Sequence, residues 1–391
     1  MKKRILFLHE AFPAGGAERI TLDIARYISE YDYQTFVCSR LQNDFRGDEL
    51  QLIPLPDTTC TVSSSNIDFL VETIQRLNID IFVLPVQAFV GLCEKIKGHT
   101  DCKLVFALHS IPFWEVTYRL YEKKKEARGS IGKQLEWYLL TYPKTMWLKK
   151  YHKTFVKIYG RIYQLADAYV VLCDKYKELF MQELHIRPEE DKITVIHNSE
   201  RMVENVSAEK KKQVLFVGRL TYEDKRIDKL LRIWNHIYRN VTDWELVLVG
   251  DGPERMNLEN YVIKKRLKRV RFVGFSNQVH QFYKDAAVIC LTSTFEGWPL
   301  CLTEAQANGV VPVAFDCSAG VREILFPSGV NGVLVPSYNE KKFAQELLIL
   351  LRDADRLKEM SLNVVQKSAS YNPNVVGGKW LNMFNLLLGK V

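Results

Sequence analysis

Two carboxylates in the second half of the chain have the type and spacing that sugar chemistry requires. Glu296 and Glu304 are separated by seven residues, and Pro299 lies between them. Pro299 suits the start of a helix, which would place Glu304 in the second turn. Each carboxylate can accept hydrogen bonds from hydroxyl groups, and the amides near residues 297–300 can contact an anion. The same spacing also suits an acid that only pairs with the helix dipole.

A basic pair lies earlier, after an apolar stretch that favours a strand. Arg219 follows Gly218 at the end of this stretch, and Lys225 comes six residues after Arg219. Because arginine presents a planar fork of donors and lysine a compact positive charge, the two together suit a diphosphate. A basic loop that faces water is the alternative.

Two strand ends in the first half also carry residues that could meet a ligand. Gly15 and Gly16 follow the first expected strand and precede a helix, so their backbone could approach an anion. The alternative is a plain tight turn, because the dinucleotide fingerprint Gly-x-Gly-x-x-Gly is absent. His109 follows another strand and could hydrogen-bond a substrate, although a lone histidine is also a common structural residue.

These residues depend on strands and helices that alternate along the whole chain, an order typical of parallel sheets with helices on both faces. In the first half the expected strands are Arg4–Leu8, Gln34–Ser39, Ile79–Leu84, Lys103–Leu108 and Ala168–Leu172. In the second half they are Gln213–Gly218, Glu245–Gly250, Val270–Val273, Ala287–Leu291, Val311–Phe315 and Gly332–Val335. We therefore expect an α/β protein with two doubly wound, Rossmann-like domains.

The expected domains cover residues 1–195 and residues 205–372, with the join in the polar stretch 186–212. Residues 374–391 are expected to form a crossover helix that joins the first domain. Ligands of such sheets bind beyond the carboxyl ends of the strands. The functional site should therefore lie in the cleft where the two domains face each other.

Length and composition exclude several classes of protein. A chain of 391 residues suggests two domains, and 47% hydrophobic with 26% charged residues is ordinary for a globular protein. No run of about 18 apolar residues is present, so we expect no membrane-spanning helix. The apolar part of the N-terminus is too short for a signal peptide. The histidines and cysteines lack the spacing of ligands, so we expect no zinc site. No cofactor is expected either.

The positive charge is concentrated in residues 121–161, which hold eleven basic and three acidic residues. This excess equals the net charge of +8 of the whole chain. Eight aromatic residues are interleaved with the basic ones: Tyr121, Trp137, Tyr138, Tyr142, Trp147, Tyr151, Phe155 and Tyr159. The mixture suits an anionic membrane surface. The alternative is a solvated helical face with its aromatics in the core, and no motif indicates nucleic acid.

Taken together, these stretches resemble the retaining glycosyltransferases of family 4, which have the GT-B fold of two Rossmann-like domains facing across a cleft. The Glu296 to Glu304 stretch corresponds to the E-x7-E signature of that family. The other matching elements follow in the family's order: Gly15-Gly16, His109, Gly218-Arg219-Leu220 with Lys225, Gly250-Asp251-Gly252-Pro253, and Val273-Gly274.

The resemblance implies roles for the residues of the second domain, which would bind the nucleotide sugar. Arg219 and Lys225 would bind the donor diphosphate and stabilise the leaving nucleotide. Glu296 would hold hydroxyls of the transferred sugar, and Glu304 would hold the ribose. The implied donor site also includes Gly218, Val273, Phe275, Gly297, Trp298, Pro299 and Leu300, with the backbone near Val273 and Phe275 reading the base.

The first domain would supply the acceptor side. His109 would act beside Arg219, Lys225 and Glu296 as a catalytic residue, near the 6-hydroxyl of the donor sugar. Gly15 and Gly16 would let the helix N-terminus meet the phosphate. The chain departs from the family pattern in two places. It has Lys225-Arg226 where the family often has Lys-Gly, and Ile196-His197-Asn198-Ser199 where the family often has Pro-Asn-Gly.

The implied activity is metal-independent, retaining transfer of a hexose or N-acetylhexosamine from a nucleotide sugar, with UDP-sugar favoured, to a growing glycan. The basic segment favours a lipid-linked acceptor and a cytoplasmic enzyme peripheral to the inner membrane face. One alternative is a transferase that uses a soluble acceptor or a membrane lipid. Another is a catalytically silent glycosyltransferase-like subunit that serves as a membrane scaffold, which the retention of both cations and both glutamates argues against.

Overall fold

The computed structural model describes residues 2–13, 15–45, 47–85, 88–127, 130–144, 149–207 and 209–390. Arg128 and Trp147 of the basic segment lie outside these residues. The chain forms two compact units, which are described separately. Unit 1 consists of residues 1–197 and 376–391, and unit 2 consists of residues 198–375.

Unit 1 is built on a seven-stranded parallel sheet in the order β3-β2-β1-β4-β5-β6-β7. The strands are β1 (Lys3–Phe12), β2 (Tyr33–Gln42), β3 (Leu50–Pro54), β4 (Ile81–Pro85), β5 (Lys103–Ala107), β6 (Ala168–Val171) and β7 (Ile193–Val195). All five strands expected in this half are confirmed, with shifted ends. The short edge strands β3 and β7 were not expected.

The sheet of unit 1 is covered by helices that come from both ends of the chain. They are α1 (Gly16–Ser29), α2 (Ser64–Arg76), α3 (Val90–His99), α4 (Trp114–Ala127), α5 (Ile131–Glu136), the π-helix η1 (Trp137–Thr141), α7 (Lys150–Leu165), α8 (Asp174–Glu183), the 3-10 helix η2 (Pro188–Glu190) and α16 (Pro373–Leu387). The C-terminal α16 packs here through Trp380 and Phe384, which are buried. The Tyr33 hydroxyl of β2 donates to Asn385 Oδ1 at 2.7 Å.

Unit 2 is built on a six-stranded parallel sheet in the order β10-β9-β8-β11-β12-β13. Its strands are β8 (Lys211–Val217), β9 (Glu245–Val249), β10 (Val270–Gly274), β11 (Ala286–Leu291), β12 (Val311–Phe315) and β13 (Val333–Val335). All six were expected from the sequence. In each sheet the chain begins in a central strand, β1 or β8, and adds the next two strands on one side. It then crosses back and adds the remaining strands on the other side, which is the doubly wound arrangement.

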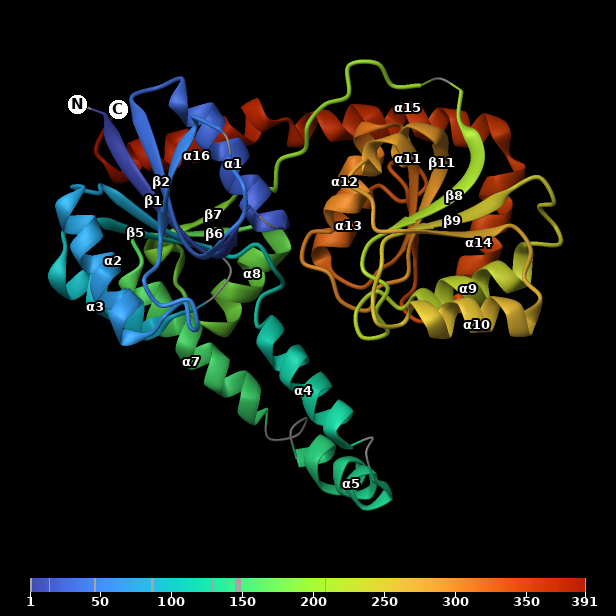
Figure 1. Cartoon of the computed structure of the whole chain (residues 1–391), viewed down its shortest axis with the longest axis horizontal. Coiled ribbons are helices and arrows are strands. Elements are labelled where there is room, and N and C mark those ends of the chain that lie inside the picture. The colour runs from blue at the N-terminus through green and yellow to red at the C-terminus, as the bar shows by residue number, and fades with distance from the viewer. Residues whose placement is uncertain are drawn as a thin grey trace. The chain divides into compact units, whose positions relative to one another are not determined.

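Helices lie on both sides of the second sheet, as Figure 1 shows. They are α9 (Ile227–Ile237), α10 (Arg255–Lys265), α11 (Val279–Asp285), α12 (Leu300–Ala307), α13 (Ala319–Leu325), α14 (Glu340–Arg352), α15 (Ala354–Ser368) and the 3-10 helix η3 (Ala369–Tyr371). The apolar stripe of α9, with Leu230, Leu231 and Trp234 fully buried, packs into the core. Packing on both faces leaves the carboxyl ends of the strands as the place for polar side chains.

Candidate functional site

The loop after β8 carries both expected cations, and they lie in different surroundings. The Arg219 side chain is 76% exposed, and its Nη2 lies 3.5 Å from Asp224 Oδ2. Lys225 is directed into unit 2 and is only 18% exposed at its side chain. Arg219 therefore presents its guanidinium to water, whereas Lys225 has a fixed protein partner.

That partner is Glu296, in the loop after β11. Lys225 Nζ lies 2.6 Å from Glu296 Oε1, and the Glu296 side chain is 9% exposed. Burial alone would lower the pKa of Lys225, but the Glu296 carboxylate raises it above its usual value. Burial raises the pKa of Cys301 to about 12, so this neighbouring thiol is neutral at physiological pH. Both members of the pair were expected from the sequence, but their direct contact was not.

Residues that follow β11 hold the same carboxylate and the same loop. The Ser293 hydroxyl donates to Glu296 Oε1 at 2.6 Å, so this oxygen has two donors. The Thr292 hydroxyl lies 3.2 Å from the carbonyl oxygen of Lys225 and 3.0 Å from that of Arg226. The sequence reasoning missed these two residues, although polar residues directly after a buried strand were an available signal.

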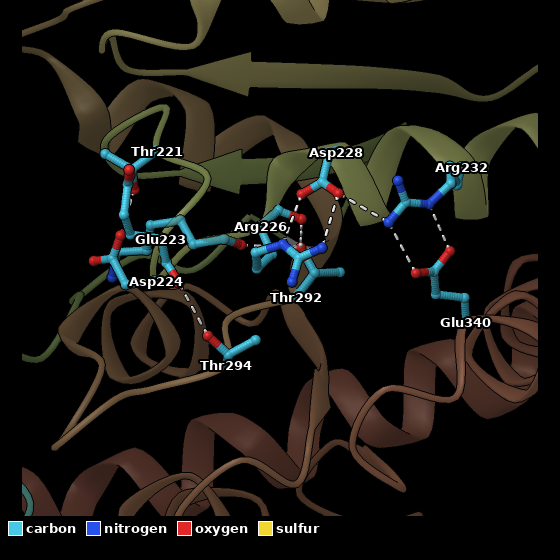
Figure 2. A network of polar contacts seen from close by, with 10 residues as sticks. Thr221, Glu223, Asp224, Arg226, Asp228, Arg232, Thr292, Thr294 and Glu340 are labelled. Atoms are coloured by element: carbon cyan, nitrogen blue, oxygen red, sulfur yellow. Dashed lines mark hydrogen bonds and ion pairs between the residues drawn. The ribbon is translucent and has the colours of Figure 1, made fainter. Parts of the chain in front are cut away.

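A second set of contacts holds the 221–226 loop from the side of α9, as Figure 2 shows. Arg226 forms two hydrogen bonds to Asp228, at 2.9 and 3.1 Å. Asp228 also accepts from Arg232 at 2.8 Å, and Arg232 pairs with both oxygens of Glu340. Arg226 itself has a positive φ of 51°, a backbone conformation that favours glycine. The ion-pair network therefore supports a residue whose backbone is strained.

Glycines bring the carboxyl ends of β8 and β9 close together beside this loop. Gly250 has a φ of 132°, and a Cβ atom there would collide with the carbonyl oxygen of Gly218. The Gly218 amide donates to the Val249 carbonyl at 3.0 Å, and the Leu220 amide donates to the Asp251 carbonyl at 2.9 Å. The close approach fixes the backbone from which Arg219 projects.

Glu304 lies on the second turn of α12, as the sequence predicted. Helix α12 begins at Leu300 with Pro299 as its N-cap residue. The buried hydroxyl of Tyr283 on α11 donates to Glu304 Oε2 at 2.7 Å. Burial, reinforced by the Glu304 charge, raises the pKa of Tyr283 well above its usual value, so this donor keeps its proton. Tyr283 was missed because it lies 21 residues before Glu304 with no local motif.

The other residues expected at the donor site of unit 2 lie around these glutamates and at the end of β10. Trp298, beside Gly297, is buried and packs edge-on against Tyr371 at a ring distance of 5.5 Å. Val273 is half-buried, whereas Phe275, just past β10, is 77% exposed. Phe275 therefore presents a free aromatic surface, and Trp298 supports the loop from within.

The residues expected in unit 1 lie at the ends of β1 and β5. Gly15 and Gly16 are exposed at the start of α1, and Gly15 has a φ of 121°. The first turn of α1 contains Glu18, whose Oε1 lies 3.6 Å from Nδ1 of the buried His9. His109 follows β5 and is half-buried. The N-terminus of α1 is thus open to solvent, with one carboxylate already beside it.

The basic aromatic segment divides into buried and exposed parts. Trp137, Phe155 and Tyr159 are buried, so the expectation that the aromatics form an interfacial surface is wrong for these three. Tyr159 contacts the Phe106 ring of β5 at 6.0 Å, whereas Trp137 contacts the Tyr142 ring at 5.7 Å. Tyr138 and Tyr142 are exposed.

The described residues contain neither a cluster suited to a metal ion nor a helix suited to span a membrane. Among these residues, no group of three or more histidine, cysteine or acidic side chains is placed to hold a metal ion. Within the same part of the chain, every helix is too short or too polar to cross a lipid bilayer.

Two family models match the chain, one after the other. Residues 14–199 match Glycosyltransferase Family 4, and residues 197–367 match Glycosyl transferases group 1. With the two parallel sheets, these matches support a GT-B glycosyltransferase like those of family 4. The expected fold class is confirmed.

Particular relatives share parts of the chain. The amylovoran biosynthesis glycosyltransferase AmsD of Erwinia amylovora is 33% identical over 189 residues, 48% of this chain and 52% of AmsD. The GalNAc-alpha-(1->4)-GalNAc-alpha-(1->3)-diNAcBac-PP-undecaprenol alpha-1,4-N-acetyl-D-galactosaminyltransferase of Campylobacter jejuni is 28% identical over 225 residues, 56% of this chain and 60% of that enzyme. The chain thus spans little more than half of the length of these relatives.

The likeness to solved structures extends over the whole chain. HepE of Anabaena, in complex with UDP, superposes with a TM-score of 0.71 at 16% identity. The superposition covers 99% of this chain and 100% of HepE. At this identity the match shows a shared fold.

Proposed function

We propose that this protein is a retaining glycosyltransferase that moves a hexose or N-acetylhexosamine from a UDP-sugar to a growing glycan. The observation that carries the proposal is the Lys225–Glu296 pair at the carboxyl edge of unit 2, with Arg219 on the same loop. The printed names of the relatives support it. AmsD acts in amylovoran biosynthesis, the Campylobacter enzyme extends a glycan on undecaprenol pyrophosphate, and HepE binds UDP.

The chemical problem is to expel a nucleoside diphosphate while positive charge develops at the anomeric carbon. Arg219, largely in water, is free to form a bidentate contact with a diphosphate oxygen pair. Lys225 stays protonated because Glu296 raises its pKa, so a second fixed positive charge faces the leaving group. Donors that are held in place before the reaction stabilise the separating charge without reorganising.

The two glutamates would bind hydroxyl groups rather than cleave the glycosidic bond as an acid and nucleophile pair. Glu296 uses Oε1 for Lys225 and Ser293, and its Oε2 would accept from a sugar hydroxyl. Tyr283 orients Glu304 for the ribose. His109, Gly15 and Gly16 would contact the donor from unit 1. The resemblance to family 4 supports retention of configuration and activity without a metal.

The acceptor proposed is a lipid-linked glycan, and the enzyme would work at the cytoplasmic face of an anionic membrane. The basic segment 121–161 supports this placement because lysines near an anionic surface each contribute about 1 kcal/mol to binding. The competing hypothesis is a soluble acceptor. In that case the rate of sugar transfer would not depend on added vesicles.

A panel of nucleotide sugars tests the donor side without knowledge of the acceptor. The protein is incubated with each compound, and release of the nucleoside diphosphate is followed by chromatography. We expect slow hydrolysis of one or two UDP-sugars, and calorimetric binding of UDP. Failure to bind or hydrolyse any member of the panel would contradict the proposal and favour the silent scaffold subunit.

A further inference from the structure

The most unusual surface of the molecule lies on a helical extension of unit 1. Figure 1 shows α4 and α7 running side by side away from the sheet, with α5 at their far end. The base of this extension is firmly packed. The Tyr159 hydroxyl of α7 donates to Glu115 of α4 at 2.9 Å, and Phe113 packs against the rings of Tyr159 and Phe180. The extension is therefore anchored where it leaves unit 1.

The far end of the extension is apolar but not buried. Between residues 130 and 144, six large hydrophobic side chains are between 44% and 79% exposed. We call this set the apolar tip: Ile131, Leu135, Tyr138, Leu139, Leu140 and Tyr142. Within it, Ile131, Leu135 and Tyr138 recur at helical spacing along α5 and the start of η1, and Tyr142 directly follows η1. Adjacent large hydrophobic side chains left in water mark an interaction surface.

Positive charge surrounds the apolar tip. Residues 121–149 hold seven basic and three acidic residues. Lys123, Lys124, Lys133, Lys144 and Lys149 form no ion pair within the part of the chain that the structure describes. Their charge is thus available to an external anion. An apolar cluster with tyrosines, flanked by unpaired lysines, is the composition of a segment that lies in the interface of an anionic membrane.

We propose that the apolar tip inserts into the acyl boundary of an anionic membrane, while the flanking lysines contact the lipid phosphates. The proposal deepens the proposed function, because it assigns membrane attachment to 131–142 rather than to charge spread over 121–161. It also accounts for the buried Phe155 and Tyr159, which anchor the extension instead of touching lipid. A second copy of the chain fits less well because two tips with the same positive flanks would repel each other.

Three variants separate insertion from attraction by charge. The tip variant I131S/L135S/L139S/L140S removes apolar area, and the charge variant K123Q/K124Q/K133Q/K144Q removes flanking charge. The control variant M256S/I263S changes two side chains of unit 2, each 73% exposed. Full-length proteins are sedimented with phosphatidylglycerol-containing or pure phosphatidylcholine vesicles, at physiological and at high ionic strength.

We expect wild type to bind the anionic vesicles and to keep part of that binding at high ionic strength, because apolar insertion is not screened by salt. The tip variant should lose at least about tenfold in partitioning. The charge variant should lose mainly the salt-sensitive part, and the control should match wild type. Unchanged circular dichroism and melting temperature would show that each variant is folded.

The proposal is wrong if the tip variant binds vesicles as well as wild type, or if high ionic strength abolishes wild-type binding. It is also wrong if the tip mediates dimers in sedimentation velocity without lipid and wild type ignores vesicles. UDP binding by wild type and the tip variant, measured without vesicles, is expected to be equal. If neither protein bound UDP, the glycosyltransferase proposal would be contradicted. The conclusion about membrane insertion would still rest on the vesicle measurements.

Discussion

Lys225 and Glu296 form a largely buried ion pair, so the loss of either residue should lower the stability of the protein. Removing one member of a buried ion pair leaves the other charge without a partner, which typically costs about 3–5 kcal/mol. We expect Lys225→Met to lower the free energy of unfolding by about this amount. Adding Glu296→Gln should recover part of the loss. Urea denaturation of the single and double variants tests this, and a double variant less stable than the single one would contradict it.

The pH dependence of the same pair follows from the raised pKa of Lys225. Its contribution to stability is complete below the ordinary lysine pKa of about 10.4. It is lost as the pH rises through the higher pKa of the folded state, because the folded protein then gives up the proton that it had retained. The stability difference between wild type and Lys225→Met should therefore be constant at neutral pH and shrink only in strong alkali.

The structure adds Tyr283 to the proposed donor site. Its hydroxyl fixes one oxygen of Glu304, and a hydrogen bond to a charged group contributes about 1.5–3 kcal/mol. We expect Tyr283→Phe to weaken UDP binding roughly tenfold, with Tyr261→Phe of the same unit as the control. Isothermal calorimetry measures both. If Tyr283→Phe bound UDP as tightly as wild type, the hydrogen bond from Tyr283 to Glu304 would not be needed for UDP binding.

The loop between β8 and α9 depends on Arg226, at a position where the pattern of the family that the chain resembles often has glycine. Arg226 has a φ of 51° and is braced by Asp228. Both Arg226→Ala and Arg226→Gly remove the contact with Asp228. Only the alanine variant retains the free-energy cost of a left-handed backbone conformation, which is about 1–2 kcal/mol. We therefore expect the glycine variant to be the more stable of the two by about 1 kcal/mol. Thermal unfolding checks the order, and the reverse order would mean that the loop relaxes.

The sequence predicted eleven strands and the helix of α9, because long alternating apolar runs carry a strong local signal. The edge strands β3 and β7 were not predicted because they are short and polar residues flank them in the sequence. At the candidate site, strand-end positions predicted Lys225 and Glu296 as functional residues. Their 2.6 Å contact joins residues 71 positions apart, which spacing alone cannot show. The sequence also could not predict that the apolar tip near Leu139 is exposed, because leucine at helical spacing normally indicates a buried core position.

At the scale of the molecule, the chain leaves unit 1, builds unit 2 and returns to unit 1 through α16. Truncating a buried tryptophan costs about 3–5 kcal/mol. Trp380→Ala should therefore lower the melting temperature of unit 1, although it lies next to unit 2 in sequence. Trp234→Ala, in the core of unit 2, should lower the other transition. Scanning calorimetry with UDP assigns the transitions, because the ligand is proposed to bind mainly to unit 2 and should raise the transition of that unit more. Equal shifts of both transitions in each variant would contradict separate cores.

Arg219 and Lys225 are proposed to stabilise a departing nucleoside diphosphate. The most direct test is the rate of UDP release from the accepted UDP-sugar at saturating donor, for wild type, Arg219→Ala, Lys225→Ala and the control Arg271→Ala. Loss of a charge contact in the transition state costs about 2–4 kcal/mol, so each site variant should be roughly 30- to 1,000-fold slower. Arg271→Ala should match wild type. Near-normal release by folded Arg219→Ala and Lys225→Ala proteins would contradict this role of the two cations.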